Sequence, residues 1–87
     1  MTKIYIYCLF ERDGALYGVY SSLKAAHRDA LKLANVGGRG VYINHDEKMV
    51  TPSLRLMRKI FAGEFDVKVN YFSESSVVNI LKTKLKE

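Results

Sequence analysis

The sequence contains no tryptophan, one proline and one cysteine among its 87 residues. The single cysteine, Cys8, excludes a disulfide within the chain and suits a reducing compartment. No apolar run reaches the length that crosses a bilayer, and the first residues lead directly into a strand pattern instead of a signal peptide. We therefore expect a soluble cytoplasmic protein without a membrane partner.

Patterns that carry catalysis or metal binding are also scarce. His45, Asp46 and Glu47 are adjacent, but neighbouring side chains in a turn rarely converge on one ion, and no second Cys or His stands at ligand spacing. The GGRG segment at 37–40 closes a helix pattern and precedes a strand, whereas phosphate-binding loops open a helix. We expect no enzyme activity, no metal site and no cofactor.

Length, composition and charge indicate a single basic domain at residues 1–87. Hydrophobic residues make up 48% and charged residues 26% of the chain, which is typical of a globular protein. A core of this size gives modest stability, which self-association often increases. The formal net charge of +5, with a pI near 9.4, favours a polyanionic partner.

The expected elements follow from hydrophobic periodicity, from turn residues at Asp13-Gly14 and in the HDEK segment at 45–48, and from capping residues, namely a serine at the start of 21–35 and Thr51. They predict strands at 3–10, 16–20, 40–44, 49–50 and 65–72, and helices at 21–35, 52–62 and 77–85. Lys82, Lys84 and Lys86 would lie on the outer side of the last helix, where they complement its dipole. The resulting order, ββαβ(β)αβα, predicts an α+β fold: a small, mostly antiparallel sheet with helices packed on one face.

The first strand, KIYIYCLF, has no plainly polar face, so something other than water is expected to meet its second face. We expect Ile4, Ile6, Cys8, Phe65, Val67, Val69 and Tyr71 to face the helices, and Tyr5, Tyr7, Lys68, Asn70 and Phe72 to share an open face. Aromatic rings beside a cation and an amide can stack unpaired bases. The same face could instead pack on a second copy or on a protein partner.

Basic residues cluster in the helix expected at 52–62. Arg55, Arg58 and Lys59 are at helical contact spacing and could bind phosphates, although a solvated helix face is the alternative. Arg39 in the glycine-rich loop and Lys68 on the open face would add contacts. The predicted nucleic-acid-binding residues are thus Arg39, Arg55, Arg58, Lys59 and Lys68, and those for stacking or self-association are Tyr5, Tyr7 and Phe72.

The segment KIYIYCLFERDGALYGVYSSLKAA, roughly the first third of the chain, resembles very short phage accessory proteins. The shared layout is a strand, an acidic-glycine turn, a strand ending in a VYSS or VFST type sequence, and an alanine-rich helix. The resemblance implies a small, basic, non-enzymatic protein that antagonises host enzymes or defence systems in the host cytoplasm. Phage inhibitors of the RNA-cleaving toxin ToxN are one such group.

The favoured hypothesis is a phage-encoded, homodimeric, sequence-tolerant RNA-binding protein that inhibits or sequesters a host defence factor such as a toxin ribonuclease. The alternative is a protein-only inhibitor or oligomeric interaction module that binds no nucleic acid and whose basic charge is incidental. The salt dependence of binding distinguishes the two hypotheses, because the affinity of a protein that neutralises phosphates falls steeply as ionic strength rises.

Overall fold

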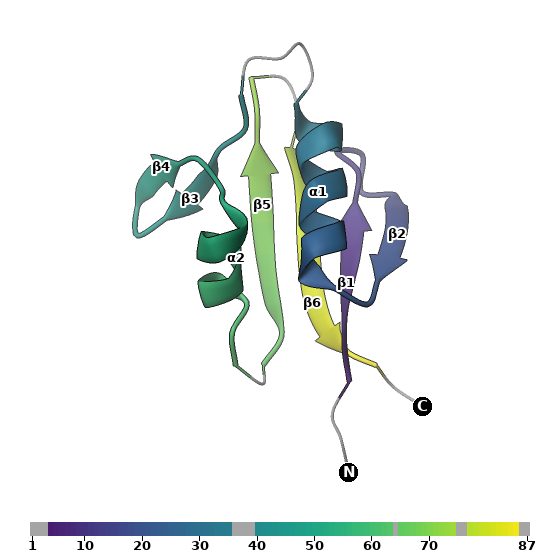
Figure 1. The fold of residues 1–87 in the computed structure, drawn as a ribbon. Helices are drawn as coiled ribbons and strands as arrows, with labels where there is room; N and C mark the ends of the chain where they lie inside the picture. Colours follow the sequence, from purple (N-terminus) through teal and green to yellow (C-terminus); the bar gives the residue numbers. More distant parts are fainter. Residues whose placement is uncertain (1–3, 36–39, 64, 75–76, 86–87) are drawn as a thin grey trace.

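The computed structural model describes residues 4–35, 40–63, 65–74 and 77–85, and it has an α+β fold (Figure 1). The elements, in order, are β1 (Tyr5–Phe10), β2 (Leu16–Tyr20), α1 (Leu23–Ala34), β3 (Ile43–His45), β4 (Lys48–Val50), α2 (Leu54–Ile60), β5 (Val67–Phe72) and β6 (Val77–Lys84). Within these ranges no helix is both long and apolar enough to cross a membrane.

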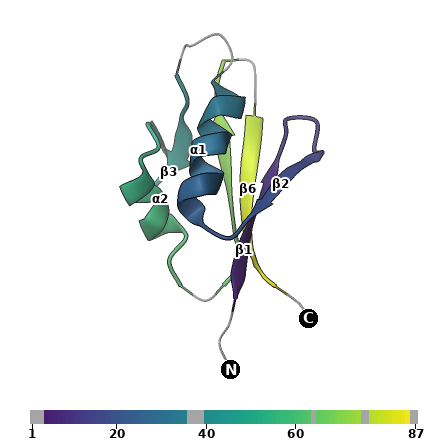
Figure 2. The same cartoon turned by 45° about the vertical axis from the view of Figure 1, so that its right-hand side comes forward.

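The main sheet has four antiparallel strands in the order β2-β1-β6-β5. The β3–β4 hairpin forms a separate small sheet that is joined to β5 through Tyr42 and Phe72, whose backbones exchange two hydrogen bonds of 2.7 Å. Both helices lie on the same face of the main sheet (Figure 2). The predicted α+β fold, with an antiparallel sheet and helices on one face, is confirmed.

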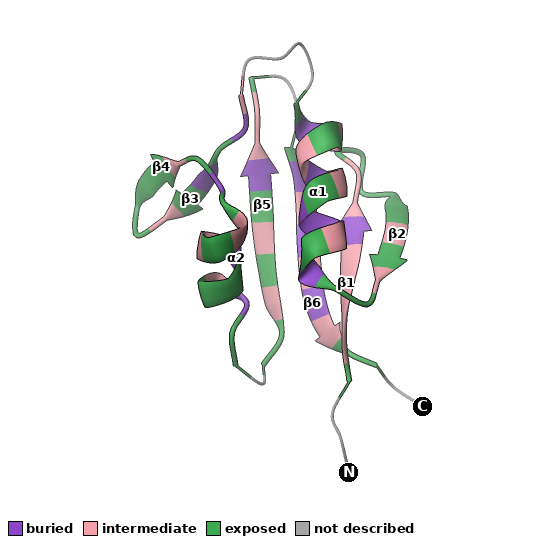
Figure 3. Cartoon of the chain, viewed as in Figure 1, coloured by how far each residue is buried: buried purple, intermediate pink, exposed green. Residues whose placement is uncertain are grey.

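The core lies between the helices and the sheet (Figure 3). Alanines at positions 26, 30 and 34 are fully buried along α1, so the helix axis can approach the strands closely. Ser22 caps this helix, because its Oγ accepts the Ala25 N–H at 3.3 Å. Ser53, and not Thr51, caps α2: its Oγ accepts the Leu56 N–H at 3.1 Å, so α2 begins later than predicted.

Both predicted turns between paired strands are present. Gly14 has a φ of +89°, a left-handed conformation that favours glycine, and its N–H donates to the Glu11 carbonyl at 2.9 Å. Asp46 and Glu47, with φ values of 52° and 64°, form the two-residue turn between β3 and β4.

The predicted terminal helix is wrong, because residues 77–84 form strand β6 in the middle of the sheet. Its buried side chains alternate at Val78, Ile80 and Lys82, and its backbone pairs with β1 on one side and β5 on the other. The apolar residues of this segment fit a helical spacing as well as a strand spacing. Lys82 occupies a buried position, so the alternation of apolar and polar residues that marks a strand is interrupted in the sequence. Pairing with two neighbouring strands decides the conformation.

Lys82 is a cation inside the core and ties β6 to the end of α2. Its Nζ donates to the carbonyl oxygens of Phe61 at 2.5 Å and Gly63 at 2.6 Å, and the residue is only 4% exposed. The same Nζ lies 4.5 Å from the ring centroid of Tyr5. Carbonyls at a helix C-terminus carry partial negative charge, so the buried ammonium is compensated where it lies.

The two faces of β1 are the reverse of the prediction. Leu9 is fully buried, the ring of Tyr7 packs edge-on against Phe61 with centroids 5.9 Å apart, and Tyr5 lies against Lys82. The open face of β1 therefore carries Ile6, Cys8 and Phe10. A strand that is apolar on both faces contains no signal that selects the inner one, and a shift of one residue exchanges the two sets.

Strand β5 has the predicted orientation. Tyr71 is fully buried and Val67 and Val69 pack against the core, whereas Lys68 is exposed on the opposite face. Phe65 is an exception, because it precedes the strand and is 61% exposed instead of facing the helices.

Replacing the buried ammonium tests the role of Lys82. We expect Lys82→Met to lower the free energy of unfolding by about 2–3 kcal/mol, because the buried Phe61 carbonyl and the part-buried Gly63 carbonyl lose a charged hydrogen-bond donor. Urea unfolding followed by circular dichroism measures the loss. Lys84→Met, an exposed change on the same strand, is the control and should shift stability by less than about 0.5 kcal/mol. Equal effects in the two variants would contradict this role.

Candidate nucleic-acid interface

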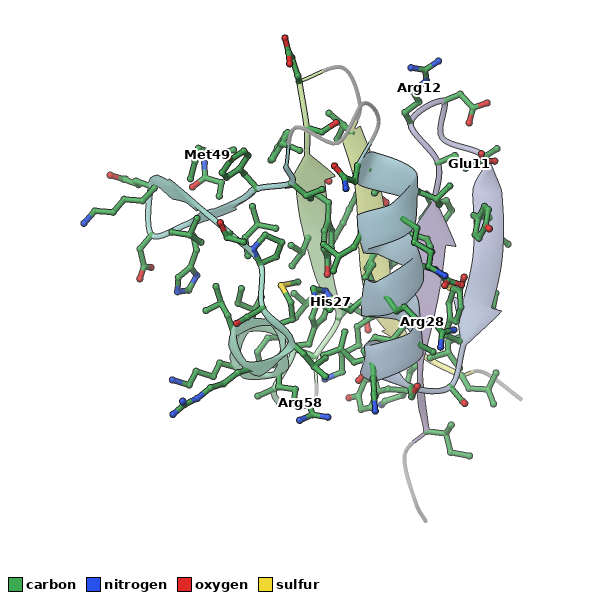
Figure 4. The ribbon with its side chains drawn as sticks, turned by 45° about the horizontal axis from the view of Figure 1, so that its top comes forward. Glu11, Arg12, His27, Arg28, Met49 and Arg58 are labelled. Atoms are coloured by element: carbon green, nitrogen blue, oxygen red, sulfur yellow. The ribbon has the colours of Figure 1, made fainter. Side chains whose placement is uncertain are left out.

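Exposed cations gather on the outer sides of the two helices. Lysines and an arginine recur every four residues along α1, which places them on one stripe, and α2 adds three more cations. The basic helix surface consists of Lys24, Arg28, Lys32, Arg55, Arg58 and Lys59. Figure 4 shows Arg28 on α1 and Arg58 on α2, both projecting outward from their helices. Because both helices cover the same face of the sheet, all six charges lie on one side of the molecule.

A groove of about 690 Å³ runs along α1 and reaches α2 at Leu54. Its lining combines the apolar side chains of Leu31 and Leu54 with the charged side chains of Lys24, Arg28 and Lys32. Long basic side chains can lay their aliphatic stems along such a surface and keep their charged ends in water. The groove is therefore suited to an extended, negatively charged ligand.

Asp29 is an acidic residue of α1 that lies beside Arg28 of the basic helix surface. Its Oδ2 accepts the Tyr20 hydroxyl at 2.7 Å, and its Oδ1 accepts Nε of Arg28 at 3.2 Å. The hydrogen bond from Tyr20 and then that from Arg28 lower the pKa of Asp29, so this carboxylate is ionised at neutral pH. Burial, followed by the hydrogen bond to Asp29, raises the pKa of Tyr20 to about 12.

Most cations of the basic helix surface form no ion pair with the described residues, although Lys32 also lies near enough to Asp29 to help lower the pKa of that carboxyl group. Arg28 is the only member that forms an ion pair with a carboxylate of the described residues, and this partner is Asp29. Five positive charges are thus available to an anionic partner on this side of the molecule.

His27 lies beneath this surface and joins α1 to β5. It is 7% exposed, and its Nδ1 is 2.7 Å from the hydroxyl oxygen of Tyr71, which is fully buried. Burial lowers the pKa of His27 and raises that of Tyr71, so both groups are neutral at physiological pH. The pair acts as a buried hydrogen-bonded link between the helix and the sheet.

The structure separates the residues that the sequence grouped as a phosphate-binding set. Arg55, Arg58 and Lys59 lie together on α2, whereas Lys68 lies on the opposite face of the sheet and cannot contact the same ligand surface. Arg39 lies outside the described residues. The predicted phosphate-binding set contains none of the cations of α1, although their four-residue spacing in the sequence indicates a stripe on one side of a helix.

The predicted aromatic set is divided as well. Tyr5 and Tyr7 face the helices, where Lys82 and Phe61 contact them, and only Phe72 remains on the open face. These three side chains therefore do not form one stacking platform. The physical reason is the reversed orientation of β1.

The turn between β3 and β4 brings only two potential metal ligands together. His45 Nε2 lies 3.5 Å from Asp46 Oδ2, and the Asp46 side chain is 87% exposed. Among the described residues there is no group of three or more His, Cys, Asp or Glu side chains that could hold a metal ion.

Comparison with known proteins found no family model that matches the chain, no match among curated proteins and no match among solved structures. Function is therefore inferred from the chemistry of the surfaces themselves.

Burial of His27 predicts a loss of stability at mildly acidic pH. Burial holds the folded-state pKa of His27 below its ordinary value of 6.5, so the unfolded state binds more protons between those two values. The free energy of unfolding should fall as pH drops through this window, from about pH 7 downward. Urea unfolding at a series of pH values measures the slope.

His27→Gln provides the control for this pH dependence, because glutamine can hydrogen-bond to Tyr71 without titrating. We expect its slope to be shallower than that of the wild type in the window just below 6.5, whatever its absolute stability. Identical slopes in the two proteins would exclude His27 as the source.

Proposed function

We propose that this protein is a non-enzymatic RNA-binding protein that contacts phosphates through the basic helix surface. One observation carries the proposal: six exposed cations lie on the helix-covered side of the molecule, and only Arg28 is paired with an acid of the described residues. Each phosphate that a lysine or arginine neutralises releases condensed counterions, which favours binding without any base contact. This electrostatic contribution to the affinity does not depend on the base sequence of the RNA.

Contact through phosphates also agrees with the positions of the aromatic residues. Tyr5 and Tyr7 pack toward the core and cannot receive a base without unpacking it. The arginines of α2 are exposed and can present their guanidinium groups to phosphate oxygens in bidentate geometry. The proposed binding is therefore tolerant of sequence and strongly dependent on salt.

The proposed cellular role is to inhibit or sequester a host defence factor such as a toxin ribonuclease, from a phage-encoded protein. The resemblance of residues 3–26 to small phage accessory proteins supports this role, as does the net charge of +5. A protein that covers RNA phosphates would withhold the RNA from an enzyme that cuts or requires it.

Charge reversal on either helix tests the RNA interface. We expect Lys24→Glu on α1 and Arg58→Glu on α2 each to weaken binding of a short fluorescein-labelled single-stranded RNA by about tenfold near physiological salt, because a phosphate contact becomes a repulsion. Fluorescence anisotropy measures the affinity. Lys48→Glu, an equal charge change in the β3–β4 hairpin, is the control and should change affinity by less than about threefold, because salt screens distant charges.

The salt dependence distinguishes phosphate contact from a general effect of net charge. In Arg58→Ala the slope of log affinity against log salt concentration should decrease by about 0.7, the value for one single-strand phosphate contact. Equal losses in Lys48→Glu and Arg58→Glu would reject the basic helix surface as the binding site. No measurable RNA binding by the wild type would favour the protein-only inhibitor instead.

A further inference from the structure

The sheet face that points away from the helices is mostly apolar on β1 and β2, and on β6 it carries Leu81 between Asn79 and Thr83. Strands alternate their side chains, so the residues of β1 and β6 that do not face the helices point out of this face, and those of β2 follow from their register. Leu16 and Val19 on β2 are 55% and 54% exposed. The apolar members of the open sheet face on β1, β2 and the middle of β6 are Ile6, Cys8, Phe10, Leu16, Val19 and Leu81, and Phe72 and Val77 add apolar side chains at one end.

The charges of this face lie only at one edge. One row across the four strands reads Val19, Cys8, Leu81 and Lys68, so three apolar side chains end in a cation on β5. None of the described residues of β1, β2 or β6 contributes a charged side chain to the face, since Lys82 and Lys84 alternate to the other side. A polyanion would find no cation at the centre of this surface.

Asp66 and Lys68 supply one charge of each sign at that edge. Asp66 Oδ2 accepts the Thr83 hydroxyl at 3.1 Å, and Thr83 is paired with Ile6, so this carboxylate lies on the open sheet face. Residues two apart in a strand point to the same face, with Cα atoms about 7 Å apart. The acid and the base are exposed side by side, and neither forms an ion pair with another described residue.

We propose that the open sheet face binds a second copy of this chain, so that two sheets stack face to face about 10 Å apart. The two copies are related by a two-fold axis that runs perpendicular to the strands at the level of residue 67. This axis places Lys68 opposite Asp66 of the partner subunit and Asp66 opposite Lys68 of the partner subunit. It crosses β1 between Ile6 and Cys8, so Cys8 lies opposite Ile6 of the partner subunit, and Ile6 lies opposite Cys8 of the partner subunit.

A second copy is the occupant that the charges favour. An acid and a base on the same strand are complementary to themselves under a two-fold rotation, whereas an unrelated protein would need a matching pair of its own. Four strands at a spacing of about 4.8 Å and about six residues in length form a face of roughly 20 by 20 Å. A face of this size is small for a specific interface, so we expect a dimer in the micromolar range.

The proposed dimer goes beyond RNA binding and does not depend on it. Stacking through the open sheet faces leaves the helices of both copies on the outside, in helix, sheet, sheet, helix order. The two basic helix surfaces then point in opposite directions, and one dimer can hold two RNA segments.

Charge reversal at the sheet edge tests the symmetry of the dimer. Asp66→Lys and Lys68→Asp should each raise the dimer dissociation constant by about tenfold, because two symmetric attractions become repulsions at once. The double variant Asp66→Lys/Lys68→Asp should return to within about threefold of the wild type, because opposite charges meet again. Sedimentation velocity over a range of protein concentrations measures the constants. Losses that add in the double variant would overturn the proposed two-fold arrangement.

A central substitution and a matched control separate this interface from the RNA surface. Leu81→Lys buries a charge at the centre and should leave only monomer, whereas Arg58→Glu should dimerise like the wild type. A circular dichroism melt establishes that each variant is folded. A dimer that persists in folded Leu81→Lys would reject this face as the interface.

The single cysteine gives a test on the wild-type chain without any variant. Cys8 lies in the proposed interface, so its reaction with a thiol reagent should slow by more than about fivefold as the protein concentration passes the dimer dissociation constant. A reaction rate that stays constant with concentration, together with a monomeric mass throughout, would overturn the proposal even if RNA binding holds. A constant dimer with freely reactive Cys8 would equally reject this interface.

Discussion

Two short helices cover only one face of the four-stranded sheet, and the rest of the molecule follows from this constraint. The covered face holds the core, where the alanines of α1 and the side chains of β5 and β6 interlock. The outer sides of the same helices must be polar, and they carry six cations. The opposite sheet face keeps apolar side chains that no helix of the described residues covers. Because the helices cover only one face of the sheet, the molecule has two chemically different surfaces: the basic helix surface and the open sheet face.

A buried lysine holds this arrangement together. Lys82 lies on the inner strand β6, and its ammonium group donates to carbonyls just after α2 ends. The interaction fixes the end of α2 over the sheet and also positions Tyr5 and Tyr7 against the core, because Tyr5 contacts the ammonium and Tyr7 contacts Phe61. The ammonium group of Lys82 therefore positions α2 on the sheet, and the basic helix surface is a separate set of cations.

The two surfaces lie on opposite sides of the sheet, so a ligand on one does not exclude a ligand on the other. In the proposed RNA complex the basic helix surface attracts phosphates through charge, so its affinity should respond to salt. In the proposed dimer the open sheet face supplies apolar area and one self-complementary charge pair, so its affinity should respond to packing. A dimer through the sheet would double the number of basic surfaces, and linked sites bind a long polyanion more tightly than one site alone.

The sequence by itself determined the local elements whose signals are short-range: the hairpin at Asp13-Gly14, the helix capped by Ser22, the alternation of β5 and the cations of α2. Tertiary structure decided three things that local patterns leave open. It made 77–84 a strand, because two neighbouring strands supply its hydrogen bonds. It chose the inner face of β1, because a strand apolar on both sides has two equivalent registers. It placed the cations of α1 and α2 on one side of the sheet, because both helices pack on the same sheet face. It placed Lys68 on the other side, because this side chain points to the sheet face that the helices leave uncovered.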